Sequence, residues 1–391
     1  MTDTPTRLLV VDDEEDLELL IRQRFRRSIR KGEIDFVFAR NGQEALSRLA
    51  ENPDIRLVLS DINMPVMDGL TLLSQLASAH PEIRAVIVSA YGDMENIRTA
   101  MNRGAFDFVT KPIHFEDLEL TIRKTLQHIY TMEQALKARD HLVTLKSELD
   151  VALNVQQSVL PPRRASHPTH DMQAIIIPAR EIGGDFYDFF FLNDHTLGLV
   201  IADVSGKGIP AALFTMVTQA FLKSAVRNFA SPARCLQDVN ELLAENNDAC
   251  VFVTVFYAAL NLKTGLLRYC NAGHNRPRVF RKSGQVEELA GTDDTVLGIV
   301  PGKEYHDASV QMAPGDGVFL YTDGISEAQN PDHEEFGDWR LDEALHRLAA
   351  PEGTDIQDIA NGVVEAVHQF VGSAPQSDDI TCIALRYKEE A

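Results

Sequence analysis

Three aspartates follow two short apolar runs near the start of the chain. Asp12 and Asp13 come directly after Leu8–Val11, and Asp61 comes directly after Leu57–Ser60. Carboxylates that share one crevice repel each other unless a hard cation lies between them, and Mg²⁺ accepts such oxygen ligands. A carboxylate beside that ion can attack a phosphoryl donor as a nucleophile. The spacing therefore predicts a magnesium-dependent phosphoryl-acceptor site, with Asp61 as the acceptor.

A hydroxyl and an ammonium group complete this first set. Ser89 follows the apolar run Ala85–Val88, and Lys111 follows Phe106–Val109. A serine hydroxyl can donate to one phosphoryl oxygen, and a lysine can neutralise the charge on the others. The structural alternative is that Asp12 and Asp13 only cap the first helix and that Asp61 only begins a turn. The matching positions of all these residues at the ends of apolar runs favour the phosphoryl site.

A second set of aspartates lies beyond residue 180. Its members stand beside glycine or other small residues, and all except the first motif lie at an edge of a predicted strand. No His or Cys motif with zinc spacing accompanies them, so Mg²⁺ or Mn²⁺ is favoured over Zn²⁺. Two such ions a few ångströms apart can lower the pKa of water and clamp a phosphate, which predicts phosphoester hydrolysis. Taken singly, each motif is also typical of a hairpin turn. The set comprises Asp185, Asp203, Asp323, Asp378 and Asp379.

Short β-rich runs alternate with helical patterns from residue 7 to about residue 124. This rhythm predicts a doubly wound α/β domain with five parallel strands and helices on both faces. In such a sheet the carboxyl ends of the strands line one crevice, which would bring the first set of residues together. The runs are Leu8–Val11, Ile34–Ala39, Leu57–Ser60, Ala85–Val88 and Phe106–Val109.

Residues 118–160 contain neither Gly nor Pro, and their apolar residues recur at steps of three or four. Such spacing predicts a long helix with an apolar seam, interrupted near Leu136–Arg139 where the register slips. The polar, proline-bearing run Pro161–Pro168 marks a boundary. Beyond it, strands connected by turns and packed with helices predict an α+β domain with antiparallel sheets. The expected division is therefore a domain at 1–124, a helical linker at 125–160 and a second domain at 161–391.

The chain carries 37 basic and 58 acidic side chains, a formal net charge of −21. This balance disfavours a phosphate-binding surface, and no basic recognition helix is visible, so DNA is not an expected partner. The longest nearly apolar stretch, Ala249–Leu260, is too short to span a bilayer, and Met1–Pro5 lacks the basic region of a secretory signal. We therefore expect a cytoplasmic protein without a membrane partner.

Motifs of the first domain are Val10–Asp13, Ser60–Pro65, Val88–Ala90 and Thr110–Pro112. Together they resemble the receiver domain of two-component response regulators. The resemblance implies a flavodoxin-like fold and phosphorylation by a sensor histidine kinase. One switch position, often tyrosine, holds a phenylalanine here, which removes a hydroxyl and keeps the ring. The implied roles are phosphoacceptor for Asp61, Mg²⁺ ligands for Asp12, Asp13, Asp61 and the Asn63 carbonyl, and switch residues for Ser89, Phe108 and Lys111.

The acidic motifs of the second domain are Glu181–Asp188, Asp203–Gly208, Thr322–Gly324 and Ser377–Thr381. Together with Asn154–Pro161 before them and Asn271–Pro277 between them, they resemble the PPM family of metal-dependent Ser/Thr phosphatases, in its SpoIIE/RsbU-like branch. The resemblance implies a PP2C-like β-sandwich flanked by helices, with two Mn²⁺ or Mg²⁺ ions.

The same resemblance implies roles for single residues of this domain. Arg180 is spaced from the first acidic motif like the phosphate-binding arginine of eukaryotic members, although an ordinary surface arginine also fits. His274 could orient a glycine turn or shuttle a proton, with the turn favoured, and Lys207 is interpreted as a loop charge. The implied metal ligands are Asp185 and Asp203 as bridges, the Val204 carbonyl, Asp323, Asp378 and, where eukaryotic relatives have an amide, Asp379.

Taken together, the two resemblances predict a response regulator in which phosphorylation of Asp61 controls a protein serine/threonine phosphatase. The implied substrate is a phosphorylated anti-sigma factor antagonist, and the linker helix is expected to form a homodimer. The alternative is a non-catalytic adaptor that binds a sigma factor or an anti-sigma protein through a PP2C-like domain. The presence of the acidic set favours the enzyme, because an adaptor has no need of metal ligands.

Overall fold

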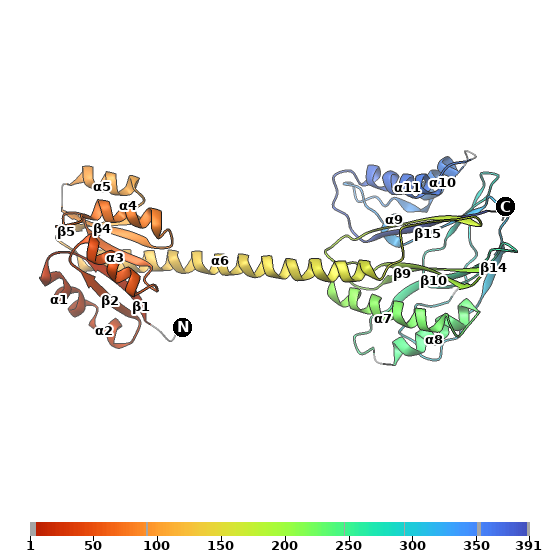
Figure 1. Ribbon diagram of the computed structural model, residues 1–391, viewed down its shortest axis with the longest axis horizontal. Coiled ribbons are helices and arrows are strands. Elements are labelled where there is room, and N and C mark those ends of the chain that lie inside the picture. Colours follow the sequence, from red (N-terminus) through yellow and green to blue (C-terminus); the bar gives the residue numbers. More distant parts are fainter. Residues whose placement is uncertain (1–4, 91–92, 246, 293, 350–352, 389–391) are drawn as a thin grey trace. The chain divides into compact units, whose positions relative to one another are not determined.

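The computed structural model describes residues 5–90, 93–245, 247–292, 294–349 and 353–388. The chain divides into two compact units, Met1–Thr144 and Leu145–Ala391 (Figure 1). Helix α6, Phe115–Ser158, begins in the first unit and ends in the second. Its backbone continues without a break through Leu136–Arg139, where we expected an interruption of the seam. The segment contains no Gly or Pro that would end a helix, so the change of apolar register there leaves the backbone intact.

Five parallel strands form the sheet of the first unit, in the order β2-β1-β3-β4-β5. Apolar side chains on its two faces form separate cores. Leu72 and Leu76 of α4 belong to one core, and Leu17 and Ile21 of α1 belong to the other. The predicted doubly wound fold is confirmed. The strands are β1 Thr6–Val11, β2 Ile34–Ala39, β3 Leu57–Asp61, β4 Arg84–Ala90 and β5 Asp107–Lys111. The helices before α6 are α1 Glu15–Arg24, α2 Arg26–Arg30, α3 Gly42–Glu51, α4 Gly69–Ala79 and α5 Met94–Asn102.

The second unit contains two antiparallel sheets, ordered β14-β11-β10-β9-β8 and β13-β12-β15-β16-β7-β6. The strands of the first are β8 Phe186–Asn193, β9 Thr196–Val204, β10 Val253–Asn261, β11 Leu266–Ala272 and β14 Ala308–Gln311. Those of the second are β6 Arg164–His167, β7 His170–Ile177, β12 Arg278–Phe280, β13 Val286–Glu288, β15 Gly317–Tyr321 and β16 Ile380–Tyr387. The antiparallel sheets predicted from the sequence are confirmed.

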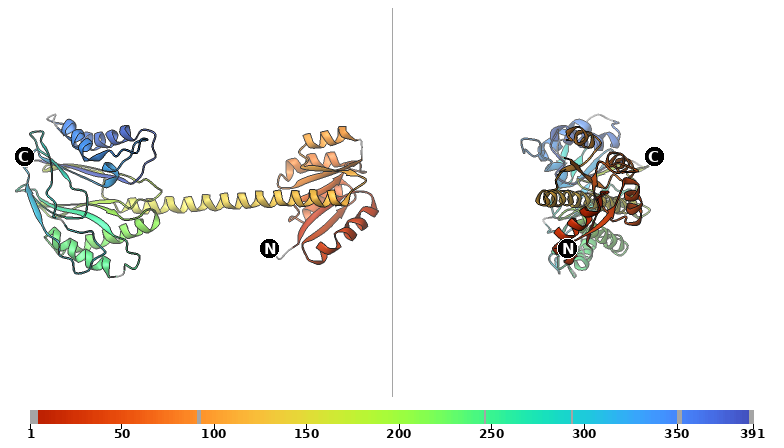
Figure 2. Two further views of the ribbon diagram at one scale, coloured as in Figure 1. Left: turned by 180° about the vertical axis from the view of Figure 1, so that it is seen from behind. Right: turned by 90° about the vertical axis from the view of Figure 1, so that its left-hand side faces the viewer.

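Alternating side chains divide the second unit into layers. In β10, Phe256 and Ala258 belong to the core between the two sheets, whereas Val255 and Tyr257 belong to a core with α7 and α8. A third core joins the outer face of the other sheet to α10 and α11. The two sheets are therefore packed face to face and covered by helices on both outer sides, as the second unit in Figure 2 shows. The helices are α7 Ile209–Ala225, α8 Pro232–Ala244, α9 Asp323–Ser326, α10 Gly337–Ala349 and α11 Ile356–Val371.

The motif Glu181–Asp188, which we expected to be a turn, contains the beginning of a strand. β8 begins at Phe186, so Asp188 lies within the sheet and only the preceding residues form the loop. The aromatic run of β8 has high strand propensity. The turn was expected because two glycines, Gly183 and Gly184, precede this run. Among the described helices, none combines the length and the apolar character that crossing a bilayer requires.

We expect the protein to lose stability at acidic pH, because the side chain of His170, at the start of β7, is buried. Its ring stacks on His167 and lies beside Phe191. Burial, and then repulsion from His167 and Lys388, lowers the pKa of His170 to about 4, although Asp171 acts in the opposite direction. Because the pKa in the folded state is the lower one, protons favour the unfolded chain below pH 6.5. We expect this residue alone to remove about 3 kcal/mol of stability by pH 4.

The measurement is the thermal unfolding midpoint of the second unit in the full chain between pH 7 and pH 4. His170→Phe should flatten the decline, because the phenyl ring fills the site and binds no proton. His195→Phe, in an exposed turn, is the matched control and should keep the wild-type pH dependence. An unchanged decline in His170→Phe would assign the acid sensitivity to other groups.

Candidate functional site

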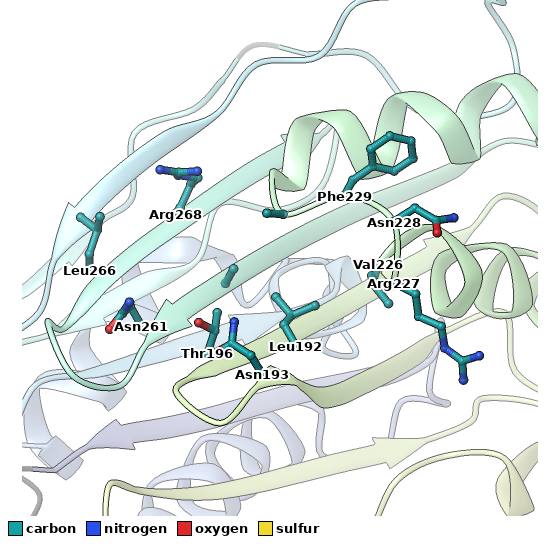
Figure 3. Close-up of a pocket in the computed structure, with 12 residues that line it drawn as sticks. Leu192, Asn193, Thr196, Val226, Arg227, Asn228, Phe229, Asn261, Leu266 and Arg268 are labelled. Carbon is teal, nitrogen blue, oxygen red and sulfur yellow. The ribbon is translucent and has the colours of Figure 1, made fainter.

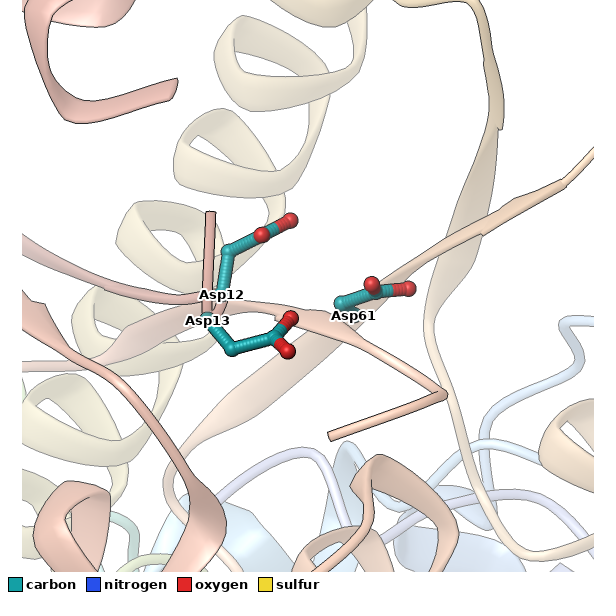
Figure 4. A group of neighbouring side chains, drawn as sticks. All are labelled: Asp12, Asp13 and Asp61. Carbon is teal, nitrogen blue, oxygen red and sulfur yellow. The ribbon is translucent and has the colours of Figure 1, made fainter. Parts of the chain in front are cut away.

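The first unit brings three aspartates together at the carboxyl edge of its sheet. Asp12 and Asp13 follow β1, Asp61 ends β3, and these strands are hydrogen-bonded neighbours. Ligand oxygens from all three carboxylates lie within 4.8 Å of one another (Figure 4). This all-oxygen donor set suits Mg²⁺, as the spacing of the sequence predicted.

Lys111, at the end of β5, binds this cluster directly. Its Nζ lies 2.9 Å from Asp61 Oδ2, 3.0 Å from Asp12 Oδ2 and 3.1 Å from Glu14 Oε1. Burial alone would lower the pKa of Lys111, but hydrogen bonds to Asp61 and Asp12 raise it above its ordinary value. Burial raises the pKa of Asp12, whereas the Glu14 backbone amide and Lys111 act in the opposite direction. The lysine is therefore a permanent cation beside the predicted acceptor.

The predicted switch residues differ in their surroundings. Ser89 is fully buried at the end of β4, and its Oγ has no hydrogen-bond partner among the described residues. A buried hydroxyl without a partner is costly, so an oxygen that enters this crevice would find a free donor. Phe108 of β5 is 39% exposed, and Asn63 is exposed beyond β3. Of these residues, only Ser89 is sealed inside the protein.

In the second unit, strand register brings the acidic motifs together in pairs. Phe186 of β8 pairs with Ala202 of β9, which places Asp185 opposite Asp203. In the other sheet Tyr321 of β15 pairs with Cys382 of β16. Continuing that register brings Asp323, the first residue of α9, close to the residues just before β16. We call the resulting set the acidic pocket; it consists of Asp185, Asp203, Asp323, Asp378 and Asp379.

Thr322 and Asp379 tie the two sheets together at this end. Thr322 Oγ1 donates to Asp185 Oδ2 at 2.8 Å and lies 3.4 Å from the Asp379 carbonyl. The Asp379 carboxylate accepts from the backbone N–H groups of Ala179 at 2.8 Å and Gly184 at 2.6 Å. The loop that carries Asp185 is therefore fixed by the motif that precedes β16.

The electrostatics of the acidic pocket fit a bound cation. Burial, reinforced by Asp203, raises the pKa of Asp185 well above its ordinary value. Burial and then Asp323 raise the pKa of Asp203 to about 7, and burial followed by Glu327 raises that of Asp323 to about 6. Carboxylates held together in this way favour a bound cation, and a set of oxygen donors alone fits Mg²⁺ or Mn²⁺.

Three further residues identified from the sequence lie around the pocket. Arg180 is exposed and lines a cleft with Asp203 and Asp378. His274 is buried, its Nδ1 lies 2.8 Å from Thr254 Oγ1, and burial lowers its pKa to about 3. A neutral ring held in this way agrees with the orienting role. Lys207, interpreted from the sequence as a loop charge, lies in the loop after β9, and its Nζ is 2.8 Å from Asp378 Oδ2.

Two sequence families match the two units. Residues 8–123 match the response regulator receiver domain, and residues 193–388, half of the chain, match Stage II sporulation protein E (SpoIIE). The chain belongs to the SpoIIE family. It carries an N-terminal receiver domain in addition, and we call its two units the receiver unit and the SpoIIE unit.

Two curated relatives each match more than half of this chain. The chain is 31% identical to protein IcfG of Synechocystis over 265 residues, which is 61% of this chain and 41% of IcfG. It is 29% identical to the phosphoserine phosphatase RsbU of Bacillus subtilis over 215 residues, 55% of this chain and 64% of RsbU. In both cases the match spans less than two thirds of the relative.

Solved structures give the fold of the SpoIIE unit. The SiaA-PP2C domain of Pseudomonas aeruginosa superposes with a TM-score of 0.56 at 22% identity, covering 63% of this chain and 99% of that domain. The RsbU and RsbW domains of a Mycobacterium tuberculosis protein give a TM-score of 0.50 at 23% identity, covering 56% of this chain and 60% of theirs. The predicted PP2C-like sandwich is confirmed.

The SpoIIE unit also contains a cavity of about 400 Å³ that is separate from the acidic pocket (Figure 3). Thr196, at the start of β9, lines this cavity, whereas Asp203 lies near the other end of the same strand. Arg227 and Arg268 are the charged residues in its lining. None of the described residues that line the cavity carries a carboxylate or belongs to the acidic pocket.

The partners of Thr322 and Lys207 were not predicted from the sequence. Thr322 precedes Asp323 in a motif that is typical of a turn, and nothing local shows that its hydroxyl reaches Asp185 across the two sheets. Lys207 has a visible signal, a cation between two glycines in the loop after a strand that carries a predicted ligand. That signal indicates proximity to the site but does not identify the partner carboxylate.

Proposed function

We propose that the SpoIIE unit is a metal-dependent protein serine/threonine phosphatase, controlled by phosphorylation of Asp61 in the receiver unit. The observation that carries the proposal is the convergence of the acidic pocket at one end of the sandwich, where burial and neighbouring carboxylates raise the pKa values of Asp185, Asp203 and Asp323. When bound, two Mn²⁺ or Mg²⁺ ions would supply Lewis acidity and a water of lowered pKa. Their ligands would be Asp185, Asp203, the Val204 carbonyl, Asp323, Asp378 and Asp379.

The chain's own side chains would hold this arrangement and the substrate. Thr322 orients Asp185 through its hydroxyl, and Asp379 fixes the loop before β8 through backbone amides. Arg180, exposed at the rim of the cleft, would bind the phosphate of the substrate through its guanidinium. In this arrangement the proposed ligand oxygens lie inside the acidic pocket, and the guanidinium of Arg180 lies at its entrance.

In the receiver unit, Asp61 would accept a phosphoryl group from a sensor histidine kinase. Lys111 would neutralise the phosphoryl charge, and the free Ser89 hydroxyl would donate to one of its oxygens. The Mg²⁺ ligands would be Asp12, Asp13, Asp61 and the Asn63 carbonyl, and Phe108 would complete the switch. Such a relay between kinase and phosphatase operates in the cytoplasm.

Relatives suggest the substrate class. RsbU and RsbP of Bacillus subtilis are both named phosphoserine phosphatases. We infer that this protein dephosphorylates a phosphorylated anti-sigma factor antagonist and so controls a sigma factor by partner switching. Exposed apolar residues along α6, among them Leu142, Val143 and Val151, support homodimer formation through that helix.

The test is phosphate release from candidate phosphorylated antagonists by the full chain, with Mn²⁺ or with a chelator. We expect release from phosphoserine or phosphothreonine only in the presence of the metal, because a bound divalent ion would lower the pKa of the attacking water. A phosphotyrosine peptide of the same length is the control and should not be hydrolysed. Binding of the antagonist without any release would instead support the adaptor.

A further inference from the structure

The ammonium group of Lys207 lies in the acidic pocket, and the reaction described above gives it no role. Its Nζ is 2.8 Å from Asp378 Oδ2 and donates to the Ser377 carbonyl at 2.7 Å. The side chain of Lys207 is 41% exposed and that of Asp378 is 38% exposed, so the pair stands at the mouth of the pocket.

The backbone holds Lys207 at this position. Gly206 and Gly208 on either side of it have φ angles of 91° and 78°, which L side chains rarely adopt. With Ser205 before them, the three residues form a tight loop between β9, which carries Asp203, and α7. Of Gly206, Lys207 and Gly208, only Lys207 has a side chain, and its ammonium group reaches the motif before β16.

The ion pair between Lys207 and Asp378 places a positive charge beside a carboxylate that we propose as a metal ligand. Among the described residues that line the cleft, the basic ones are Arg180 and Lys207. Lys207 makes the ion pair to Asp378, a predicted metal ligand. A divalent cation bound to the same carboxylate would stand within ion-pair distance of the ammonium group, and the two positive charges would repel each other.

We propose that Lys207 is a tethered cation that competes with a divalent metal ion for Asp378. The inference rests on the proposed function, since it requires the acidic pocket to bind metal ions. In the ion-free protein Lys207 neutralises Asp378, and it must leave that carboxylate when the ion binds. The lysine therefore lowers the metal affinity of the pocket and stabilises the pocket without metal.

Calorimetric titration of Mn²⁺ into the full chain tests the competition without any assay of activity. Lys207→Met should bind Mn²⁺ in the pocket about fivefold more tightly, which corresponds to the upper range for an exposed ion pair. Lys207→Arg keeps the charge and should retain the wild-type affinity. Lys223→Met is the matched control, because it removes the same charge and an ion pair of 3.1 Å to Asp188 in the same unit. The receiver site is common to all variants and serves as an internal reference.

The thermal unfolding temperature is a second measurement, and it is compared in a chelator and at saturating Mn²⁺. In a chelator, Lys207→Met should unfold at a lower temperature than wild type, because Asp378 loses its counter-ion. At saturating Mn²⁺ that difference should disappear. Equal or weaker Mn²⁺ binding by Lys207→Met overturns the competition alone. Absence of any pocket binding event in every variant overturns the proposed function, and this inference with it.

Discussion

Asp203→Ala should reduce Mn²⁺-dependent phosphate release at least about 100-fold, the scale on which removal of one charge-stabilising group acts. Asp203 lies near the end of β9 opposite Asp185, and burial together with Asp323 raises its pKa to about 7. Its carboxylate interacts with Asp323 and with the other carboxylates of the pocket. Without it, the pocket would lose one of the proposed ligands of both ions, so both metal binding and turnover should fail.

Stability separates this loss from unfolding. In a chelator the variant should unfold at or above the wild-type temperature, because the substitution removes one of several carboxylates that repel each other. Asp203→Asn keeps the shape of the side chain and should lose activity as well. Asp194→Ala, in the exposed turn before β9, is the matched control and should leave phosphate release unchanged. Substantial turnover by either Asp203 variant would contradict the assignment of the pocket as the active site.

The doubly wound parallel sheet of the receiver unit was the part of the structure that the sequence predicted best. The rule that carboxyl ends of parallel strands meet at one edge placed Asp12, Asp61 and Lys111 together, and they lie within hydrogen-bond distance in the structure. Strand β8 was missed because two glycines dominated the interpretation of its first residues. The pattern of residues in a single segment does not show whether a glycine pair ends a turn or opens a strand.

Contacts between the two sheets of the SpoIIE unit could not be derived in this way. Thr322 reaches Asp185 across 137 positions of sequence, and Lys207 reaches the Ser377 carbonyl across 170. Such contacts depend on how one sheet is rotated over the other, which the alternation of apolar residues does not specify. The residue types were therefore predictable, whereas the partners of each were not.

Asp61→Asn should abolish stable phosphorylation of the receiver unit, at least about 100-fold below wild type, because an amide cannot attack a phosphoryl donor. Incubation with acetyl phosphate and Mg²⁺, followed by phosphate-affinity electrophoresis, measures the effect. Asp68→Asn is the matched control. Asp68 caps α4 by accepting from the Thr71 backbone N–H at 2.7 Å, and asparagine caps a helix equally well. Label that persists in Asp61→Asn would place the acceptor elsewhere.

Gln156, near the end of α6, contacts the loop that leads to the acidic pocket. Its Nε2 donates to the Gly183 carbonyl at 2.8 Å, and the next residue, Gly184, donates to Asp379 at 2.6 Å. α6 is one continuous helix that begins just after the switch strand β5, so a shift or rotation of this helix reaches the loop that carries Asp185.

Beryllofluoride, a phosphate mimic at Asp61, should therefore change both the oligomeric state and the rate of phosphate release of the wild-type chain, and neither in Asp61→Asn. Gln156→Leu should keep the change in oligomeric state and lose the change in rate, because it cuts only the last contact. Gln157→Leu, at an exposed neighbouring position, should keep both. Sedimentation and phosphate release in matched samples measure the two quantities. If beryllofluoride alters neither in the wild type, the receiver does not act through α6, because the helix would then transmit no change in either assembly or catalysis.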